Sequence, residues 1–98
     1  MSRIIRFKQW TGTLEVQKYS NGRIALELMD MDDGEPILRA TVNLPEEYME
    51  ANEVAIKNYS ENEGIYNVLV EEEVIYPLNR WANSGHVSIP ICKLKNYL

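Results

Sequence analysis

Apolar and polar residues alternate on both sides of the dipeptide Asn21-Gly22. The run before it, residues 13–18, places Leu14 and Val16 on one face, and the run after it, residues 23–30, alternates in the same way. A period of two is typical of strands that are half buried against a core. Because asparagine and glycine adopt positive φ readily, the pattern predicts a β-hairpin closed by a type I′ turn.

Two further strands are expected at sheet edges. Residues 3–8 direct Ile5 and Phe7 inward and carry basic side chains of the kind that protect an exposed edge. Residues 87–92 also alternate, and Pro90 confines that strand to an edge or a bulge because proline has no N–H to donate.

The middle of the chain predicts two more strands. The turn at residues 32–36, in which Gly34 is free to take positive φ, leads into a strand at residues 37–44. Another short strand is expected at residues 53–58. The remaining segments predict connections at residues 10–12 and 46–52, a short extended piece at 74–77 and a loop at 78–85.

One helix is expected, from Glu61 to about Val70. Ser60 and Glu63 have the spacing of a capping box, and the apolar residues that follow recur at helical spacing. The acidic run at residues 71–73 opposes the helix dipole, so the helix is expected to end before or within it.

These elements predict an α+β fold. The 98 residues form a single domain with its core at roughly residues 3–94, in which a mostly antiparallel sheet of about five strands, opening with a meander, packs against one α-helix.

Composition favours a soluble cytoplasmic protein. The chain is 45% hydrophobic, and no apolar run approaches the roughly 20 residues of a membrane span. The basic N-terminus is not followed by the apolar block of a signal peptide. Cys92 is the only cysteine and cannot form an internal disulfide, which agrees with a reducing compartment.

The acidic side chains are concentrated in the centre of the chain. The net charge is −5, but residues 30–73 hold thirteen acidic side chains against two basic ones, a formal charge of −11. This block is either a solvated surface that prevents self-association or a docking surface for a basic partner.

No constellation of catalytic or metal-binding residues is recognised. His86 could neighbour Ser84 and Ser88, but a half-exposed strand histidine is the simpler interpretation, and Cys92 has no neighbour in sequence that would activate it. One histidine and one cysteine exclude the usual zinc ligand sets, and residues 30–36 do not have the register of a calcium loop. We therefore expect no enzyme activity, no cofactor and no metal.

Two tryptophans lie beside arginines. Arg80 and Trp81 could stack on a base or anchor a protein interface, and Trp10 lies close to Arg6 and Lys8. The alternative is that the tryptophans cover the core and the arginine stems cover the tryptophans.

Several segments match a known pattern: residues 18–23, 34–36, 41–45, 52–54, 58–64, 84–85, 87 and 89–92. Over roughly residues 13–94 the chain resembles a family of small bacterial proteins of unknown function that is common in phages and conjugative elements. It departs from that family at Glu72 and Glu73, where the family usually has a small residue. It departs again at Trp81, which lies in a loop that usually carries smaller side chains in the family. The resemblance implies a mobile-element origin and an action on host machinery, and it supplies no catalytic residues.

The favoured hypothesis is a non-catalytic acidic binding module. It would inhibit a host defence or nucleic-acid-binding protein, in the manner of an anti-CRISPR or anti-restriction protein, by presenting carboxylates to a basic surface. The residues expected to bind the partner are Asp32, Asp33, Glu35, Glu71, Glu72, Glu73, Arg80 and Trp81.

The alternative hypothesis is nucleic-acid binding through a basic, tryptophan-containing edge, which the net charge opposes. The residues of this edge are Arg3, Arg6, Lys8, Arg80, Lys93 and Lys95, with Trp10 and Trp81 as stacking platforms. A homodimer formed through an unpaired strand edge is compatible with either hypothesis.

Overall fold

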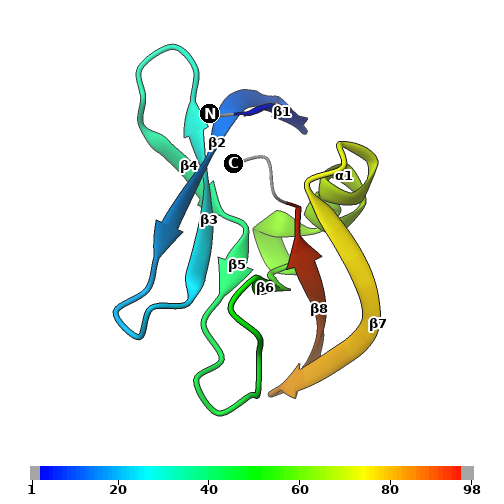
Figure 1. The fold of residues 1–98 in the computed structure, drawn as a ribbon. Coiled ribbons are helices and arrows are strands. Elements are labelled where there is room, and N and C mark those ends of the chain that lie inside the picture. Colours follow the sequence, from blue (N-terminus) through cyan, green and yellow to red (C-terminus); the bar gives the residue numbers. More distant parts are fainter. Residues whose placement is uncertain (1–2, 96–98) are drawn as a thin grey trace.

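A computed structural model describes residues 3–95, which form two four-stranded antiparallel sheets and one short helix (Figure 1). The first sheet has the strand order β1-β2-β3-β4 and the second the order β5-β6-β8-β7. In chain order the elements are β1 (Arg3–Phe7), β2 (Trp10–Lys18), β3 (Ile24–Asp30), β4 (Pro36–Arg39), β5 (Thr41–Val42), β6 (Glu53–Ile56), a 3₁₀ turn (Ser60–Asn62), α1 (Ile65–Glu71), β7 (Ile75–Ser84) and β8 (Val87–Leu94). The α+β class is confirmed, with eight strands rather than about five.

The hairpin β2–β3 is confirmed, but its turn is not of type I′. Tyr19 N–H donates to the carbonyl of Arg23 at 2.8 Å, and Gly22 N–H donates to the carbonyl of Tyr19 at 2.9 Å. Gly22 has φ +86°, whereas Asn21 keeps the ordinary negative φ. The loop is therefore a three-residue turn closed by a glycine bulge, the other common solution for an Asn-Gly hairpin.

The strand predicted at residues 37–44 changes sheets in its middle. Ala40 N–H donates to the carbonyl of Leu26 in the first sheet, and the Ala40 carbonyl accepts from Lys57 N–H beside the second, both at 2.8 Å. The chain bends at this residue and is divided into β4 and β5, which belong to different sheets. A strand that bends in this way can pass from one sheet to the other, so that the two sheets enclose one core.

The main core lies between the two sheets and α1. Ile5 and Phe7 of β1 are buried, as predicted, and pack with residues of both sheets and of the helix. The largest fully buried side chains of this core, among residues 3–95, are Ile5, Leu14, Leu26, Leu28, Val54, Ile56, Ile65, Leu69, Val74 and Ile75.

The predicted capping box does not form. Ser60 has φ +57° and begins a 3₁₀ turn, and α1 begins only at Ile65, after Gly64 with φ +101°. The helix N-terminus is capped from a distance, because the Asn58 Oδ1 atom accepts the N–H groups of Gly64 at 3.0 Å and Tyr66 at 2.9 Å. The helix ends at Glu71, within the acidic run, as expected.

Residues 75–94 form one long hairpin. The predicted loop at 78–85 is wrong, since β7 runs for ten residues and pairs with β8 from Ile75 to Ser84. A bulge between Pro77 and Arg80 interrupts the register and thereby hides the alternation in the sequence. Residues 10–12, predicted as a connection, likewise belong to β2.

The expected edge position of the strand at residues 87–92 is wrong, because β8 lies between β6 and β7, yet Pro90 is tolerated there. The strand pairs with β7 along most of its length. Its ladder with β6, in contrast, covers only Ile91 to Lys93 and therefore begins at the residue after Pro90. The half of β8 that holds Pro90 therefore has strand partners on the β7 side alone, which satisfies the restriction on proline.

Candidate protein-binding surface

The two groups of carboxylates predicted to bind a partner lie on different sides of the molecule. Asp32, Asp33 and Glu35 belong to the β3–β4 turn, and Glu71 and Glu72 lie at the C-terminal end of α1. Figure 1 shows the turn and the helix end well separated, with the sheets between them. The fold therefore divides the acidic block into separate clusters.

The β3–β4 turn uses some of its own carboxylates. The Asp30 Oδ1 atom accepts the N–H of Asp32 at 2.7 Å, and the Asp33 Oδ1 atom accepts the N–H of Glu35 at 3.0 Å. Gly34 has φ +72°, as predicted for this turn. The side chains of Asp32 and Glu35 are exposed and make no hydrogen bond within residues 3–95.

The helix that ends in the second cluster packs against an exposed aromatic side chain. Helix α1 runs next to the edge strand β7 (Figure 1), and Trp81 of β7 is 56% exposed. One side of its ring meets Tyr66 of α1, with 6.4 Å between the ring centroids. We call the exposed part of these two elements, formed by Tyr66, Glu71, Glu72 and Trp81, the α1–β7 surface.

The residues at this surface differ in burial and in ion pairing. The pKa of Tyr66 is raised because its hydroxyl is partly buried, and its ring lies against that of Trp81. Glu71 and Glu72 are exposed and form no ion pair within the described chain. Glu73, in contrast, lies 3.3 Å from the Lys95 ammonium.

Arg80 does not join Trp81 on this surface. Neighbouring residues of a strand point to opposite faces, and the Arg80 guanidinium is held on the far side of the second sheet. There it donates to Glu53 at 2.9 Å, to Glu47 at 3.4 Å and to the carbonyl of Tyr48. The two residues of the predicted pair therefore have different roles: Arg80 makes contacts within the fold, and Trp81 is exposed.

The target of Arg80 is the acidic connection at residues 44–52, which we call the strap. Arg23 also binds the strap. Its guanidinium donates hydrogen bonds to the Leu44 carbonyl at 2.5 Å and to the Glu47 carbonyl at 2.7 Å. Under the strap lies a second, smaller apolar cluster that includes Ile89 and Ile91. No local sequence signal identifies these contacts, because both arginines are distant from the strap in sequence.

The residues considered for chemistry are not arranged for it. Ser84, His86 and Ser88 are exposed around the β7–β8 turn. Cys92 is fully buried, and burial raises the pKa of its thiol to about 12. No group of three metal-ligating side chains occurs among residues 3–95. No helix in that range is long and apolar enough to cross a membrane.

Three basic side chains of the alternative hypothesis, Lys8, Arg80 and Lys95, take part in the fold, whereas Arg6 and Lys93 are exposed. Lys8 donates to the Glu61 carbonyl at 3.0 Å, and Lys95 pairs with Glu73. Trp10 is partly buried and stacks on Phe7 with 6.5 Å between ring centroids, which makes it a core residue. Trp81 is therefore the more exposed tryptophan of the two.

Comparison with known proteins adds no assignment: no family model, curated protein or solved structure matches the chain.

Proposed function

We propose that this chain is a small, non-catalytic binding module that contacts a basic partner protein through the α1–β7 surface. The observation that carries the proposal is the exposure of Trp81 against Tyr66 of α1, a helix that ends in Glu71 and Glu72, two exposed carboxylates with no ion pair among residues 3–95. Tryptophan is among the residues most enriched at the energetic centres of protein interfaces. An exposed indole that packs against a second ring presents apolar surface that a partner protein would remove from water.

The chemistry of the surface favours a lysine or arginine in the partner. A guanidinium or ammonium can lie over the indole face of Trp81, and a second basic side chain can pair with Glu71 or Glu72. The strap and the β3–β4 turn leave further unpaired carboxylates elsewhere, so the acidic field of residues 30–73 extends beyond this surface. This field steers a basic partner toward the molecule over roughly 8–10 Å at physiological salt.

The resemblance to small phage and conjugative-element proteins suggests the kind of partner. Proteins of mobile elements act on host machinery in the cytoplasm, and the host proteins with the most basic surfaces are those that bind nucleic acid. We therefore propose a host defence or nucleic-acid-binding protein as the partner, with inhibition by occupation of its basic surface. Direct nucleic-acid binding by this chain is disfavoured, because Lys8, Arg80 and Lys95 are engaged in contacts of the fold.

The test compares two charge reversals in one chain. Immobilised wild type, Glu71→Lys/Glu72→Lys and Asp32→Lys/Asp33→Lys capture proteins from a bacterial host lysate at 50 and at 300 mM salt. Each captured protein is then titrated against the three chains. We expect the reversal on the α1–β7 surface to weaken the partner at least tenfold, and the matched reversal on the opposite side to change affinity by less than threefold.

Trp81→Ala supplies the second arm. We expect it to weaken binding about tenfold or more while the melting temperature changes by only a few degrees, since the side chain is mostly exposed. Equal losses from both charge reversals, or full affinity in Trp81→Ala, would remove this surface from the proposal. Retardation of nucleic acid by the wild-type chain at low salt would favour the alternative function.

A further inference from the structure

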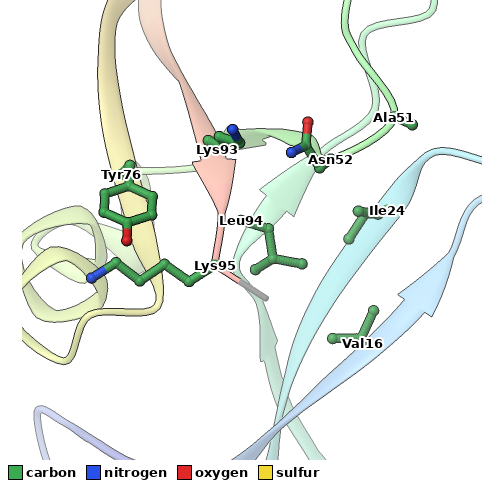
Figure 2. Close-up of a pocket in the computed structure, with 8 residues that line it drawn as sticks. All are labelled: Val16, Ile24, Ala51, Asn52, Tyr76, Lys93, Leu94 and Lys95. Carbon is green, nitrogen blue, oxygen red and sulfur yellow. The ribbon is translucent and has the colours of Figure 1, made fainter. Parts of the chain in front are cut away.

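A groove opens where the first and second sheets separate, on a part of the molecule that the proposed function does not use. Figure 2 shows Val16 and Ile24 on the β2–β3 wall, with Tyr76, Leu94 and Lys95 across from them. Its volume is about 630 Å³, within the range of about 300–1,000 Å³ that is usual for small-molecule sites. The described residues that line it are Val16, Ile24, Ala51, Asn52, Tyr76, Lys93, Leu94 and Lys95.

The floor of the groove is apolar and uncovered. Within residues 3–95, β1 pairs with β2 as far as Leu14, and the next residue of β2 on the same face, Val16, lies beyond that pairing. Val16 is 40% exposed, and Ile24 and Leu94 are partly exposed. Three branched side chains facing one hollow form a surface that an aliphatic group would remove from water.

The rim of the groove is positively charged. Lys93 and Lys95 are the charged side chains among the described lining residues, although the chain as a whole carries −5. Lys95 lies 4.2 Å from the centroid of the Tyr76 ring and 3.3 Å from a Glu73 oxygen, so it is held at the rim. Lys93 is exposed and has no carboxylate partner within residues 3–95.

We infer that this groove binds a small amphipathic anion, with a carboxylate or phosphate head at Lys93 and Lys95 and an aliphatic tail on Val16, Ile24 and Leu94. The charge of the rim disfavours cationic ligands, and the apolar floor disfavours sugars and other fully polar molecules. The Asn52 side chain and the Tyr76 hydroxyl are polar groups at the same site that can fix the orientation of the head.

The experiment uses decanoate and decylamine, which share one chain length and differ in the sign of the head. Backbone amide chemical shifts of the full chain are followed by NMR during each titration, below the concentration at which either probe forms micelles. We expect saturable shifts with decanoate at residues 52, 76 and 93–95, and at least tenfold weaker binding of decylamine. Decyl phosphate in a third titration distinguishes a phosphate head from a carboxylate head.

Three variants locate the site. Lys93→Gln is expected to weaken decanoate about two- to fivefold, whereas Arg6→Gln, which removes the same charge from an exposed position on β1, leaves it unchanged. Glu73→Gln releases Lys95 from its ion pair and is expected to strengthen decanoate about twofold. Val16→Asp places a carboxylate on the exposed floor and is expected to abolish binding.

Equal affinity for decanoate and decylamine would overturn the inference, as would shifts centred on Trp81 or no saturable shift at all. These results are independent of the proposed function, because the charge reversals at Glu71 and Glu72 and the variant Trp81→Ala do not alter the residues that line the groove.

Discussion

Arg23 and Arg80 bind the same segment of chain from two different sheets. Arg23, in the β2–β3 turn, donates to the carbonyls of Leu44 and Glu47, and Arg80, in β7, donates to the side chain of Glu47 and to the carbonyl of Tyr48. The two planar guanidinium groups thereby supply donors to an irregular segment that has few backbone hydrogen bonds of its own. Part of the acidic charge of the chain is used in this way to hold the fold.

Replacing Arg80 is therefore expected to destabilise the protein. Arg80→Ala should lower the free energy of unfolding by about 1–3 kcal/mol, because it removes charge-assisted hydrogen bonds and leaves Glu53 partly buried without its partner. Arg80→Lys should recover less than half of that loss, since a single ammonium cannot reproduce the forked geometry. Urea unfolding of the purified variants measures both values.

The matched control is Arg6→Ala, which removes an exposed arginine from β1 and should change stability by less than about 0.5 kcal/mol. If Arg80→Ala is as stable as Arg6→Ala, the strap is not held by the contacts described.

Asn62 should be the most sensitive polar residue of the 3₁₀ turn. It is fully buried, and its Nδ2 atom donates to the Arg39 carbonyl at 2.7 Å, at the point where the chain leaves the first sheet. Its Oδ1 atom has no hydrogen-bond partner within residues 3–95. Asn62→Ala should cost about 1–3 kcal/mol, since the carbonyl loses its donor.

Asn62→Asp should cost more than Asn62→Ala at pH 7, because it places a carboxylate against a carbonyl in a buried site. Denaturant unfolding of the two variants gives the comparison directly. A carboxylate variant as stable as the alanine variant would show that Asn62 lies in contact with solvent.

The sequence predicted the β2–β3 hairpin because its alternation is unbroken. It failed where a local irregularity hides the period: the bulge between Pro77 and Arg80 conceals β7, and the bend at Ala40 divides one expected strand into two. The capping box was wrong because Asn58, rather than Ser60, supplies the oxygen that caps α1. A cap supplied from outside the helix has no fixed spacing that a pattern could recognise.

The candidate binding residues show the same limit. Exposure of Glu71 and Glu72 agrees with what their residue type suggests, whereas the exposure of Trp81 and the separation of the two acidic clusters depend on the tertiary structure. Arg80 was expected at a partner surface and lies instead against the strap, a contact across 33 residues with Glu47. Long-range ion pairs of this kind are set by the tertiary structure.

Gly12 is required by a close backbone approach in the first sheet. A Cβ atom at this position would lie 2.2 Å from the Met29 carbonyl oxygen and 3.2 Å from a methyl carbon of Leu28. Gly12→Ala should therefore cost about 3 kcal/mol or more, since the strands β2 and β3 must move apart. Gly34→Ala, whose Cβ would meet nothing within 4 Å but which has φ +72°, should cost only about 1–2 kcal/mol.

Thermal unfolding of the two glycine variants tests the difference. Similar melting temperatures for Gly12→Ala and Gly34→Ala would contradict the close approach of β2 to β3.

Cys92 should behave as a protected core thiol. It is fully buried, and burial raises the pKa of its thiol to about 12 from an ordinary value of 9.0. At pH 8 its reaction with a disulfide reagent should be at least about 10³-fold slower than in the urea-unfolded chain, because reaction requires opening of the core.

The same shift predicts a dependence of stability on pH. The thiol of the unfolded chain loses its proton near pH 9, whereas the folded thiol keeps it until about pH 12, so the unfolded state gains stability over that interval. The contribution of Cys92 is therefore fully present below pH 9 and is lost progressively as the pH rises toward 12. Cys92→Ala lacks this group, and its free energy of unfolding should fall less between pH 8.5 and 10.5 than that of the wild type. Parallel pH profiles for the two proteins, or rapid labelling of the folded chain at pH 8, would show that the thiol is accessible.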